Sequence, residues 1–195
     1  MIDLSNNGER VQIGITCAGE VGRHINRYFF ALQHINKYET EIKNICDFGC
    51  GTGYGSAILA SSGKKVAGID VCQEVINYAK TQYKNVQFHT KDVTAKKLDL
   101  DFDCAIAFEI IEHVEDLKQL FENLYFAKII IGSYPYLERL GNNPYHVRYR
   151  LTKRLAIDNL GSQYHINFWF QTADGAIVKE TTNRVNTIFV AKKNE

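Results

Sequence analysis

Four glycines are clustered in the segment ICDFGCGTGYGS, where an apolar run gives way to a stretch that can form a helix. They are Gly49, Gly51, Gly53 and Gly55. Glycine adopts positive φ angles at little cost and has no side chain, so such a loop lets the backbone approach a ligand closely. The following helix adds free N–H groups and the positive end of its dipole. The loop therefore predicts a site for a nucleoside-containing cofactor.

The residues around this loop distinguish between a dinucleotide and another nucleoside-containing cofactor. The dinucleotide pattern G-x-G-x-x-G is not met from any start, because Tyr54 or Ser56 stands where the third glycine is needed. Asp47 precedes the loop, and its charge would repel a pyrophosphate but suits the amino group of S-adenosylmethionine (SAM). Asp70 ends the next predicted strand and can accept hydrogen bonds from both ribose hydroxyls; the alternative is a helix N-cap.

A third acid, Asp92, follows the next predicted strand. It can accept from the exocyclic amine of adenine while the Val93 N–H serves a ring nitrogen, although an acid here could also be a simple turn residue. Ligands of open α/β sheets bind at the carboxyl ends of the strands. Three strand ends with an acid at one edge of the sheet therefore favour SAM as cofactor, with S-adenosylhomocysteine (SAH) as product.

The segment EIIEH follows the fourth predicted strand and contains candidates for the chemistry. Methyl transfer from a sulfonium chiefly requires alignment of the nucleophile, and a hydroxyl nucleophile also needs its proton removed. We predict His113 as the catalytic residue, acting as a general base or as a cofactor-side hydrogen-bond partner. On a helical turn Glu109 would share a face with Glu112 and His113. These residues, with or without His146, could instead hold a divalent cation that orients a catechol or diol. A third alternative is that EH only closes the strand; we assign no residue to a metal.

The elements that must position these residues follow from hydrophobic periodicity. An amphipathic helix is predicted over about 20–38. Predicted strands cover Asn44–Phe48, Lys65–Ile69, Val86–His89, Cys104–Phe108 and Lys128–Gly132, and predicted helices cover Tyr54–Ser62, Glu74–Tyr83 and Asp116–Phe126. Strands that alternate with helices indicate a mostly parallel sheet with helices on both faces.

The C-terminal part has a different pattern. A helix is predicted over Thr152–Leu160, followed by strands His165–Phe170 and Asn186–Lys192 with a hairpin turn signal at Asp174–Gly175. The prediction is an α/β, Rossmann-like sheet of seven strands, mostly parallel, with a C-terminal antiparallel hairpin. We expect one domain over 1–195: a helical cap (1–43), a cofactor-binding core (44–132), and a substrate loop with closing strands (133–195). Both prolines, Pro135 and Pro144, lie in the predicted substrate loop.

The series ICDFGCGTGYGS, VAGIDV, KDV and FDCAIAFEIIEHVED resembles the motif ladder of class I SAM-dependent methyltransferases. GER at Gly8–Arg10, RY at Arg27–Tyr28 and NPYHVR at Asn143–Arg148 are similar to small-molecule and sugar methyltransferases of the ubiquinone-biosynthesis type. Ubiquinone O-methyltransferases and RNA-terminal 2′-O-methyltransferases use a similar ExxEH for metal. The resemblance implies cofactor contacts at Gly49, Gly51 and Asp70 first, then at Asp47, Cys50, Gly53, Val71, Asp92, Val93 and Phe108.

The functional expectation is methyl transfer to a small-molecule acceptor through an oxygen nucleophile, on a sugar, nucleotide sugar, quinone or phenol. A SAM-binding sensor or partner subunit without turnover, or an RNA 2′-O-methyltransferase, are the alternatives. Nucleic acid is a disfavoured partner, because the formal net charge is +1 and the place of the DNA-methyltransferase Pro-Pro motif reads FEII. A basic group could grip a phosphate or form a solvated helix face: Arg148, Arg150, Lys153 and Arg154.

Composition is that of a globular protein, with 45% hydrophobic and 23% charged residues. The N-terminal sequence lacks the apolar core of a signal peptide, and no apolar run approaches the roughly 18 residues of a membrane span. The five cysteines form no CxxC pair, so we expect reduced thiols and a cytoplasmic location. The sequence does not indicate an oligomeric state.

Overall fold

The structure is a computed structural model that describes residues 3–4, 10–38, 40–96 and 98–194. Its strands are β1 (Asn44–Phe48), β2 (Lys65–Asp70), β3 (Gln87–Thr90), β4 (Cys104–Phe108), β5 (Ile129–Pro135), β6 (Tyr164–Gln171), β7 (Ile177–Val178) and β8 (Asn186–Lys193). Its helices are α1 (Ala18–Asn36), α2 (Tyr54–Ala60), α3 (Gln73–Gln82), α4 (Leu117–Leu124) and α5 (Lys153–Leu160), with 3₁₀ turns η1 (Ile111–His113) and η2 (Gly161–Gln163). Of the motif GER, Gly8 and Glu9 lie outside the described residues.

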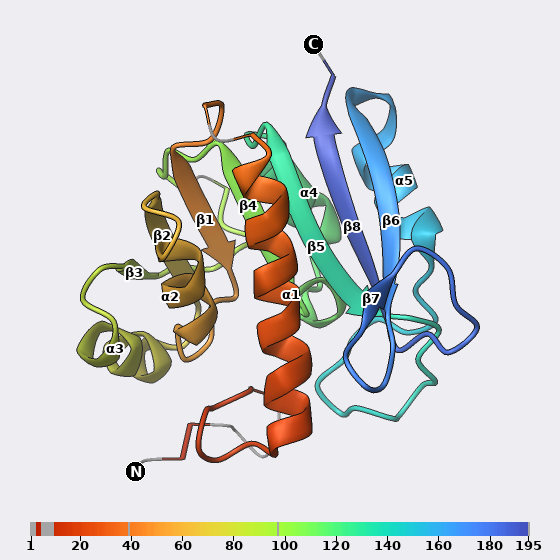
Figure 1. Cartoon of the computed structure of the whole chain (residues 1–195), viewed down its shortest axis with the longest axis horizontal. Coiled ribbons are helices and arrows are strands. Elements are labelled where there is room, and N and C mark those ends of the chain that lie inside the picture. The colour runs from red at the N-terminus through yellow and green to blue at the C-terminus, as the bar shows by residue number, and fades with distance from the viewer. Residues whose placement is uncertain (1–2, 5–9, 39, 97, 195) are drawn as a thin grey trace.

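The described strands form one sheet in the order β3-β2-β1-β4-β5-β8-β6-β7 (Figure 1). β1 to β5 run parallel, with β1 between β2 and β4. Parallel strands covered on both faces are apolar throughout rather than alternating, and all of CAIAF in β4 is buried. Figure 1 shows α1 in front of the sheet and α4 behind it, so the predicted α/β architecture with helices on both faces is confirmed.

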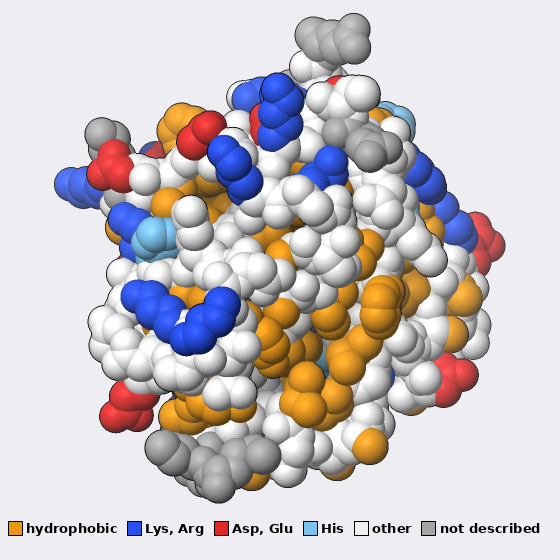
Figure 2. Space-filling model, turned by 60° about the vertical axis from the view of Figure 1, so that its left-hand side comes forward, with side chains coloured by type: hydrophobic (Ala, Val, Ile, Leu, Met, Phe, Trp, Pro, Cys, Tyr) orange, Lys and Arg blue, Asp and Glu red, His pale blue; other side chains and the backbone are white. Residues whose placement is uncertain are grey.

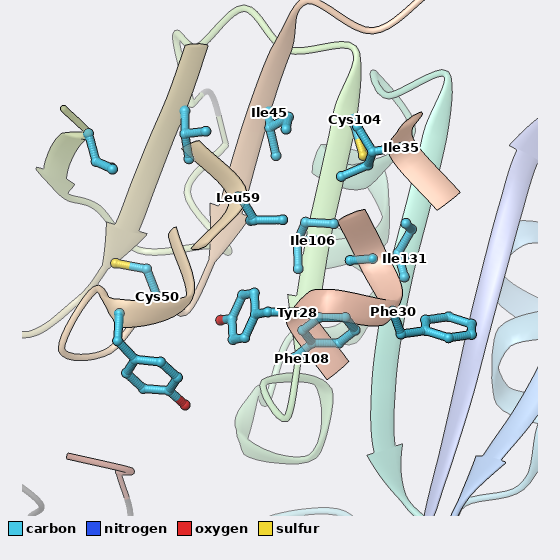
Figure 3. Close-up of a cluster of buried hydrophobic side chains, with 14 of the residues drawn as sticks. Tyr28, Phe30, Ile35, Ile45, Cys50, Leu59, Cys104, Ile106, Phe108 and Ile131 are labelled. Atoms are coloured by element: carbon cyan, nitrogen blue, oxygen red, sulfur yellow. The ribbon is translucent and has the colours of Figure 1, made fainter. Parts of the chain in front are cut away.

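Two hydrophobic clusters hold the layers together. Ile45, Ile106 and Ile131 lie on one face of the sheet and pack with Tyr28 and Ile35 of α1 (Figure 3). The strand residues between them face the other way, toward α4 and α5. Burial of each such large apolar side chain stabilises the fold by about 1.5–3 kcal/mol. The alternation therefore fixes which strand residues face α1 and which face α4 and α5.

The C-terminal strands confirm the predicted antiparallel closure but not the predicted number of strands. β8 pairs antiparallel with both β5 and β6. The prediction of seven strands was wrong, because the chain turns at Asp174–Gly175 and pairs a short β7 with β6. Gly175 has φ +91° and donates its N–H to the Thr172 carbonyl at 2.9 Å, which makes the turn tight enough for this local pairing. The functional division of the chain near residues 43 and 132 stays a prediction.

The surface of the described part of the chain gives two further observations. On the face drawn in Figure 2, Lys, Arg, Asp and Glu side chains are scattered around a mostly uncharged middle, so this face has no continuous basic track for a nucleic-acid backbone. None of the described helices combines the length and the apolar character needed to cross a membrane.

Candidate functional site

A cavity of about 730 Å³ opens at the carboxyl ends of β1, β2, β3 and β4. This volume lies within the range typical of small-molecule and cofactor sites. Its walls come from the glycine loop, the ends of β2 and β3, the segment after β4, one side of α1 and the segment after β5. The topology therefore brings the predicted motifs to one place, as expected for an open α/β sheet.

Gly49, Gly51 and Gly53 all adopt positive φ, at +70°, +52° and +85°. A Cβ added at Gly51 meets nothing within 4 Å, so the space beside it belongs to the cavity. A Cβ at Gly53 would instead lie 2.8 Å from both Ala79 and Phe88. Gly51 is thus a cradle for a ligand, whereas Gly53 allows close packing and does not line the cavity. The predicted cofactor contact at Gly53 stays a prediction, and the structure gives this glycine a packing role.

The N–H groups of the loop point back into the protein. Gly49 and Cys50 donate to the Ile69 carbonyl at 2.8 and 2.9 Å. Gly51 donates to the Asp70 carboxylate at 3.1 Å. A pyrophosphate binds through such backbone N–H groups, and here they already have acceptors. The loop therefore suits a cofactor that touches its backbone surface rather than one held by its amides.

Asp70 lines the cavity and is 7% exposed. Besides the Gly51 N–H, it accepts the Cys72 N–H at 2.9 Å. Cys72 is itself the N-cap position of α3, so Asp70 does not cap that helix. Its carboxylate sits between the glycine loop and the loop after β2, where a ribose would meet it.

Asp47 is fully buried and does not line the cavity. Its carboxylate accepts the Ser56 hydroxyl at 2.6 Å and the Tyr28 hydroxyl at 3.3 Å. Burial raises the pKa of Asp47 to about 7. The predicted direct contact between Asp47 and the cofactor's amino group is therefore not supported, because the side chain turns toward α1 and α2 instead of toward the ligand.

The loop after β3 contributes Asp92 and Val93 to the cavity. Asp92 accepts the N–H and the hydroxyl of Thr94 at 2.8 and 2.7 Å, which closes the turn. Asn123 of α4 donates to the Val93 and Ala95 carbonyls at 2.8 and 2.9 Å, which fixes the turn from below. The cavity is lined by these predicted cofactor residues: Gly49, Cys50, Gly51, Asp70, Val71, Asp92, Val93 and Phe108.

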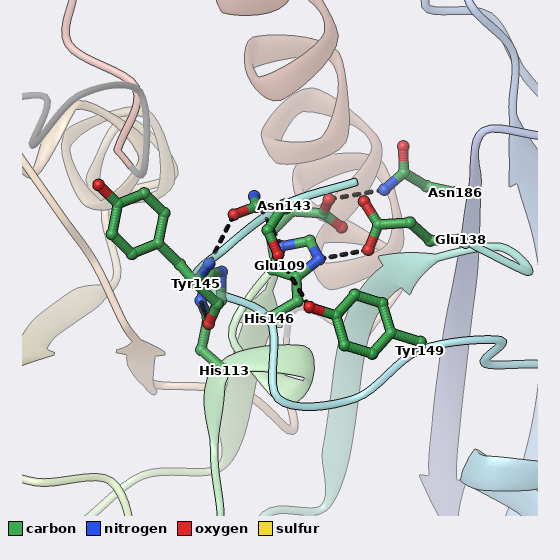
Figure 4. A network of polar contacts seen from close by, with 8 residues as sticks. All are labelled: Glu109, His113, Glu138, Asn143, Tyr145, His146, Tyr149 and Asn186. Carbon is green, nitrogen blue, oxygen red and sulfur yellow. Dashed lines mark hydrogen bonds and ion pairs between the residues drawn. The ribbon is translucent and has the colours of Figure 1, made fainter. Parts of the chain in front are cut away.

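The segment after β4 is not the helical turn that was predicted to align Glu109 with Glu112 and His113. Glu109 has φ +50°, and the 3₁₀ turn η1 begins only at Ile111. The Glu109 carboxylate accepts the Ser133 hydroxyl at 2.6 Å. It also accepts the Asn186 amide at 2.6 Å (Figure 4). The left-handed residue turns this side chain toward β5 and β8, and so removes it from the face of Glu112.

Glu112 and His113 both line the cavity. Glu112 is 1% exposed, and neither of its carboxyl oxygens has a hydrogen-bond partner. Burial and, next, the charge of Glu109 raise the pKa of Glu112 well above its ordinary value. The Nδ1 atom of His113 lies 3.1 Å from the Tyr145 carbonyl (Figure 4). Because a carbonyl only accepts, this contact assigns the proton to Nδ1 and makes Nε2 the acceptor nitrogen of the neutral ring.

His146 packs against His113 with ring centroids 4.7 Å apart. Its Nδ1 contacts the Glu138 carboxylate, and its Nε2 lies 3.1 Å from the Asn143 amide nitrogen (Figure 4). Ligand atoms of Glu112, His113 and His146 all lie within 4.8 Å of one another. Of the residues considered for a cation site, the structure therefore brings Glu112, His113 and His146 together. Glu109 points elsewhere, and both ring nitrogens of His146 already have contacts within the protein.

Arg27 of the motif RY is a cavity residue that was not among the predicted cofactor contacts. It is 1% exposed and lines the cavity. Its Nη1 donates to the Gln171 side chain at 2.7 Å, whereas Nε and Nη2 have no partner. A buried guanidinium with unpaired donors is costly unless a ligand anion completes it. The available signal was an Arg in the apolar stripe of α1, in register with Ala31 and Ile35.

Part of the basic group after β5 is used within the protein. Arg148 donates to the Val114 and Glu115 carbonyls at 3.1 and 2.6 Å. Lys153 lies over aromatic rings of β6, and Arg154 pairs with Asp158 of its own helix at 2.7 Å. These contacts favour the structural interpretation of this group over a phosphate grip.

Comparison with known proteins agrees with this geometry. Residues 46–126 match the family model of a methyltransferase domain. Ubiquinone biosynthesis O-methyltransferase of Coxiella burnetii is 33% identical over 86 residues, which cover 42% of this chain and 37% of that protein. Its counterpart from Rickettsia akari is 36% identical over 95 residues, which cover 47% and 38%. The chain thus spans less than two fifths of the length of these curated relatives.

Solved structures share the fold. The methyltransferase domain of bacterial CtHen1-C superimposes with a TM-score of 0.68 at 19% identity, covering 89% of this chain and 100% of that one. Magnesium protoporphyrin IX methyltransferase from Synechocystis PCC 6803, solved with bound SAM, gives a TM-score of 0.69 at 18% identity, covering 95% and 86%. The family match therefore shows a methyltransferase domain over residues 46–126, and with the sheet topology these likenesses show that the chain has the fold of the solved methyltransferases.

Proposed function

We propose that this protein binds SAM and transfers its methyl group to an oxygen nucleophile of a small-molecule acceptor. The observation that carries the proposal is the single cavity in which the Gly51 cradle and Asp70 face the same space as Glu112 and His113. SAM supplies an activated methyl group on a sulfonium. The protein then has to bind the cofactor, align the acceptor and remove a proton.

The residues present fit SAM at both of its ends. Asp70 would accept from the ribose hydroxyls, and Asp92 with Val93 would hold the adenine. Arg27 has two unpartnered nitrogens that match the carboxylate of the methionine part. The space beside Gly51 would receive the chain between these two ends.

His113 is the proposed base. The Tyr145 carbonyl holds its Nδ1 proton, so Nε2 can take the proton of an acceptor hydroxyl. The loop that carries Tyr145 is itself anchored, because the N–H groups of Val147 and Arg148 donate to the Glu112 carbonyl at 3.0 and 3.2 Å. The base and its support are therefore fixed to the same 3₁₀ turn.

A second candidate is catalysis with a divalent cation at Glu112, His113 and His146. It is favoured by the unpartnered carboxyl oxygens of Glu112 and by the close approach of the three ligand atoms. Such a cation would require Glu112 to lose its proton and His146 to give up Glu138 or Asn143. Oxygen ligands favour magnesium and imidazoles favour zinc, so this mixed set accommodates either.

The test is transfer of a labelled methyl group from SAM to a panel of acceptors: catechols, nucleotide sugars and an RNA 3′ end. Label on a catechol or a sugar hydroxyl supports the proposed function. Label on RNA alone supports the alternative of an RNA 2′-O-methyltransferase. Tight SAH binding without transfer to any acceptor supports a SAM-binding sensor.

A further inference from the structure

Gln171 lies at the end of β6 and is fully buried. Its amide nitrogen donates to the Arg23 carbonyl at 2.9 Å and to the Gly175 carbonyl at 3.3 Å. Carbonyls only accept, so these two contacts fix which end of the amide is nitrogen. The amide oxygen must then face Arg27. It accepts a hydrogen bond from the Nη1 atom of Arg27 at 2.7 Å.

This contact determines how the Arg27 guanidinium is turned. With Nη1 held by Gln171, Nε and Nη2 form the other side edge of the planar group, and both atoms are buried without a partner. Such an edge binds a carboxylate through two parallel hydrogen bonds, which depend strongly on orientation. Arg27 lines the cavity and Gln171 does not. Gln171 therefore does not touch a ligand itself, and Arg27 is the cavity residue whose side-chain donors it orients.

We propose that Gln171 is a positioning residue, which orients Arg27 so that its Nε and Nη2 bind the carboxylate of the methionine part of SAM. The inference rests on the proposed function. It assigns part of the cofactor site to β6, a strand outside residues 46–126 that match the methyltransferase family model. The turn after β6 is part of the same hydrogen-bond network, because Asn26 of α1 also donates to the Gly175 carbonyl at 3.2 Å.

The test compares two ligands by calorimetry on the full chain. SAH has the carboxylate, and 5′-methylthioadenosine has the same adenosine part without it. For Gln171→Met, which keeps the side-chain length without hydrogen bonds, we expect SAH to bind about 5–20-fold more weakly. The affinity for methylthioadenosine should stay within about twofold. In Arg27→Leu the SAH loss should be at least as large, and adding Gln171→Met to that variant should cause no further loss.

A second variant keeps the inference testable if Gln171→Met does not fold. Gln171→Glu retains an acceptor for Arg27, but the new carboxylate offsets the positive charge of Arg27. This variant should therefore also bind SAH more weakly and bind methylthioadenosine with unchanged affinity. Equal losses for both ligands, no loss for SAH, or an undiminished effect of Gln171→Met in the Arg27→Leu background would each overturn the role of Gln171. Failure of the unaltered protein to bind either ligand would instead overturn the proposed function.

Discussion

The Asp70 carboxylate accepts the N–H of Gly51 at 3.1 Å, which links the end of β2 to the glycine loop after β1. The same carboxylate accepts the Cys72 N–H, so one side chain joins the two loops that would surround a ribose. Gly51 keeps open space on its other side. The loop is therefore braced by the protein and presents a surface without side chains to the ligand.

Replacement of Gly51 by alanine should impair cofactor binding more than folding. The added Cβ enters the cavity, and φ +52° strains any L-residue by about 1–2 kcal/mol. Gly63→Ala is the matched control, since Gly63 also has positive φ with nothing near its Cβ but does not line the cavity. Both variants should lose similar unfolding free energy in urea, and only Gly51→Ala should lose SAH affinity, by tenfold or more. Equal SAH affinity in the two variants would show that the loop is misassigned.

Asp70→Asn should weaken SAH binding by more than tenfold, because hydrogen bonds to a charged group contribute about 1.5–3 kcal/mol. Asp103→Asn is the comparison. Asp103 also accepts two backbone N–H groups, from Lys43 and Asn44 at 2.9 and 3.1 Å, but outside the cavity. Calorimetry should show a loss of SAH affinity for Asp70→Asn alone. A similar change in both variants would mean that Asp70 acts only on the fold.

The two candidate mechanisms at His113 differ in their response to chelation. With His113 as base, His113→Ala should lower the rate by about 10²–10⁴-fold and a chelator should do nothing. With a cation, the chelator should abolish activity, magnesium or zinc should restore it, and Glu112→Gln should behave like His113→Ala. His165→Ala, at an exposed site on β6, should leave the rate unchanged. A chelator-insensitive enzyme with full activity in His113→Ala contradicts both mechanisms.

Asp47 should make stability depend on pH. Its pKa is about 7 in the folded protein and near 3.8 when exposed. At a pH between these two values, the carboxyl is therefore protonated in the folded state and ionised in the unfolded state. Its contribution to stability is full below about pH 4 and falls by up to about 1.4 kcal/mol per pH unit as pH rises toward 7. The asparagine side chain in the variant Asp47→Asn cannot titrate. The unfolding free energy of this variant relative to that of the parent protein should therefore rise between pH 5 and pH 8. Parallel urea-unfolding curves at both pH values would refute the raised pKa.

The sequence predicted those parts of the fold that depend on local pattern. The succession of β1 to β5 along the chain and the helices between them follow from periodicity, and the glycine loop follows from its motif. The extra strand β7 was missed because only two residues pair, too few for a period to show. The turn at Asp174–Gly175 was predicted from the sequence. Which strands would pair across it depends on tertiary contacts, which the local pattern does not give.

Side-chain direction at the site could not be predicted from the sequence. Asp47 was expected to face the cofactor, yet the hydroxyls of Tyr28 and Ser56 hold it inside. Glu109 was expected to join Glu112, and a single left-handed residue turns it away. Arg27 donates to the side chain of Gln171, 144 residues later in the chain. Such long-range polar contacts leave no trace in spacing.

The most direct test of the account is a calorimetric titration of the purified protein with SAH and, separately, with NAD. The N–H groups of Gly49, Cys50 and Gly51 already donate to protein acceptors, so a pyrophosphate has little to bind. Asp70 and Arg27, in contrast, match the ribose and the carboxylate of SAH. We predict one SAH site per chain, a matching rise in melting temperature equivalent to about 2.7 kcal/mol at a hundredfold excess over Kd, and no heat with NAD. Saturable binding of NAD without binding of SAH would contradict the account.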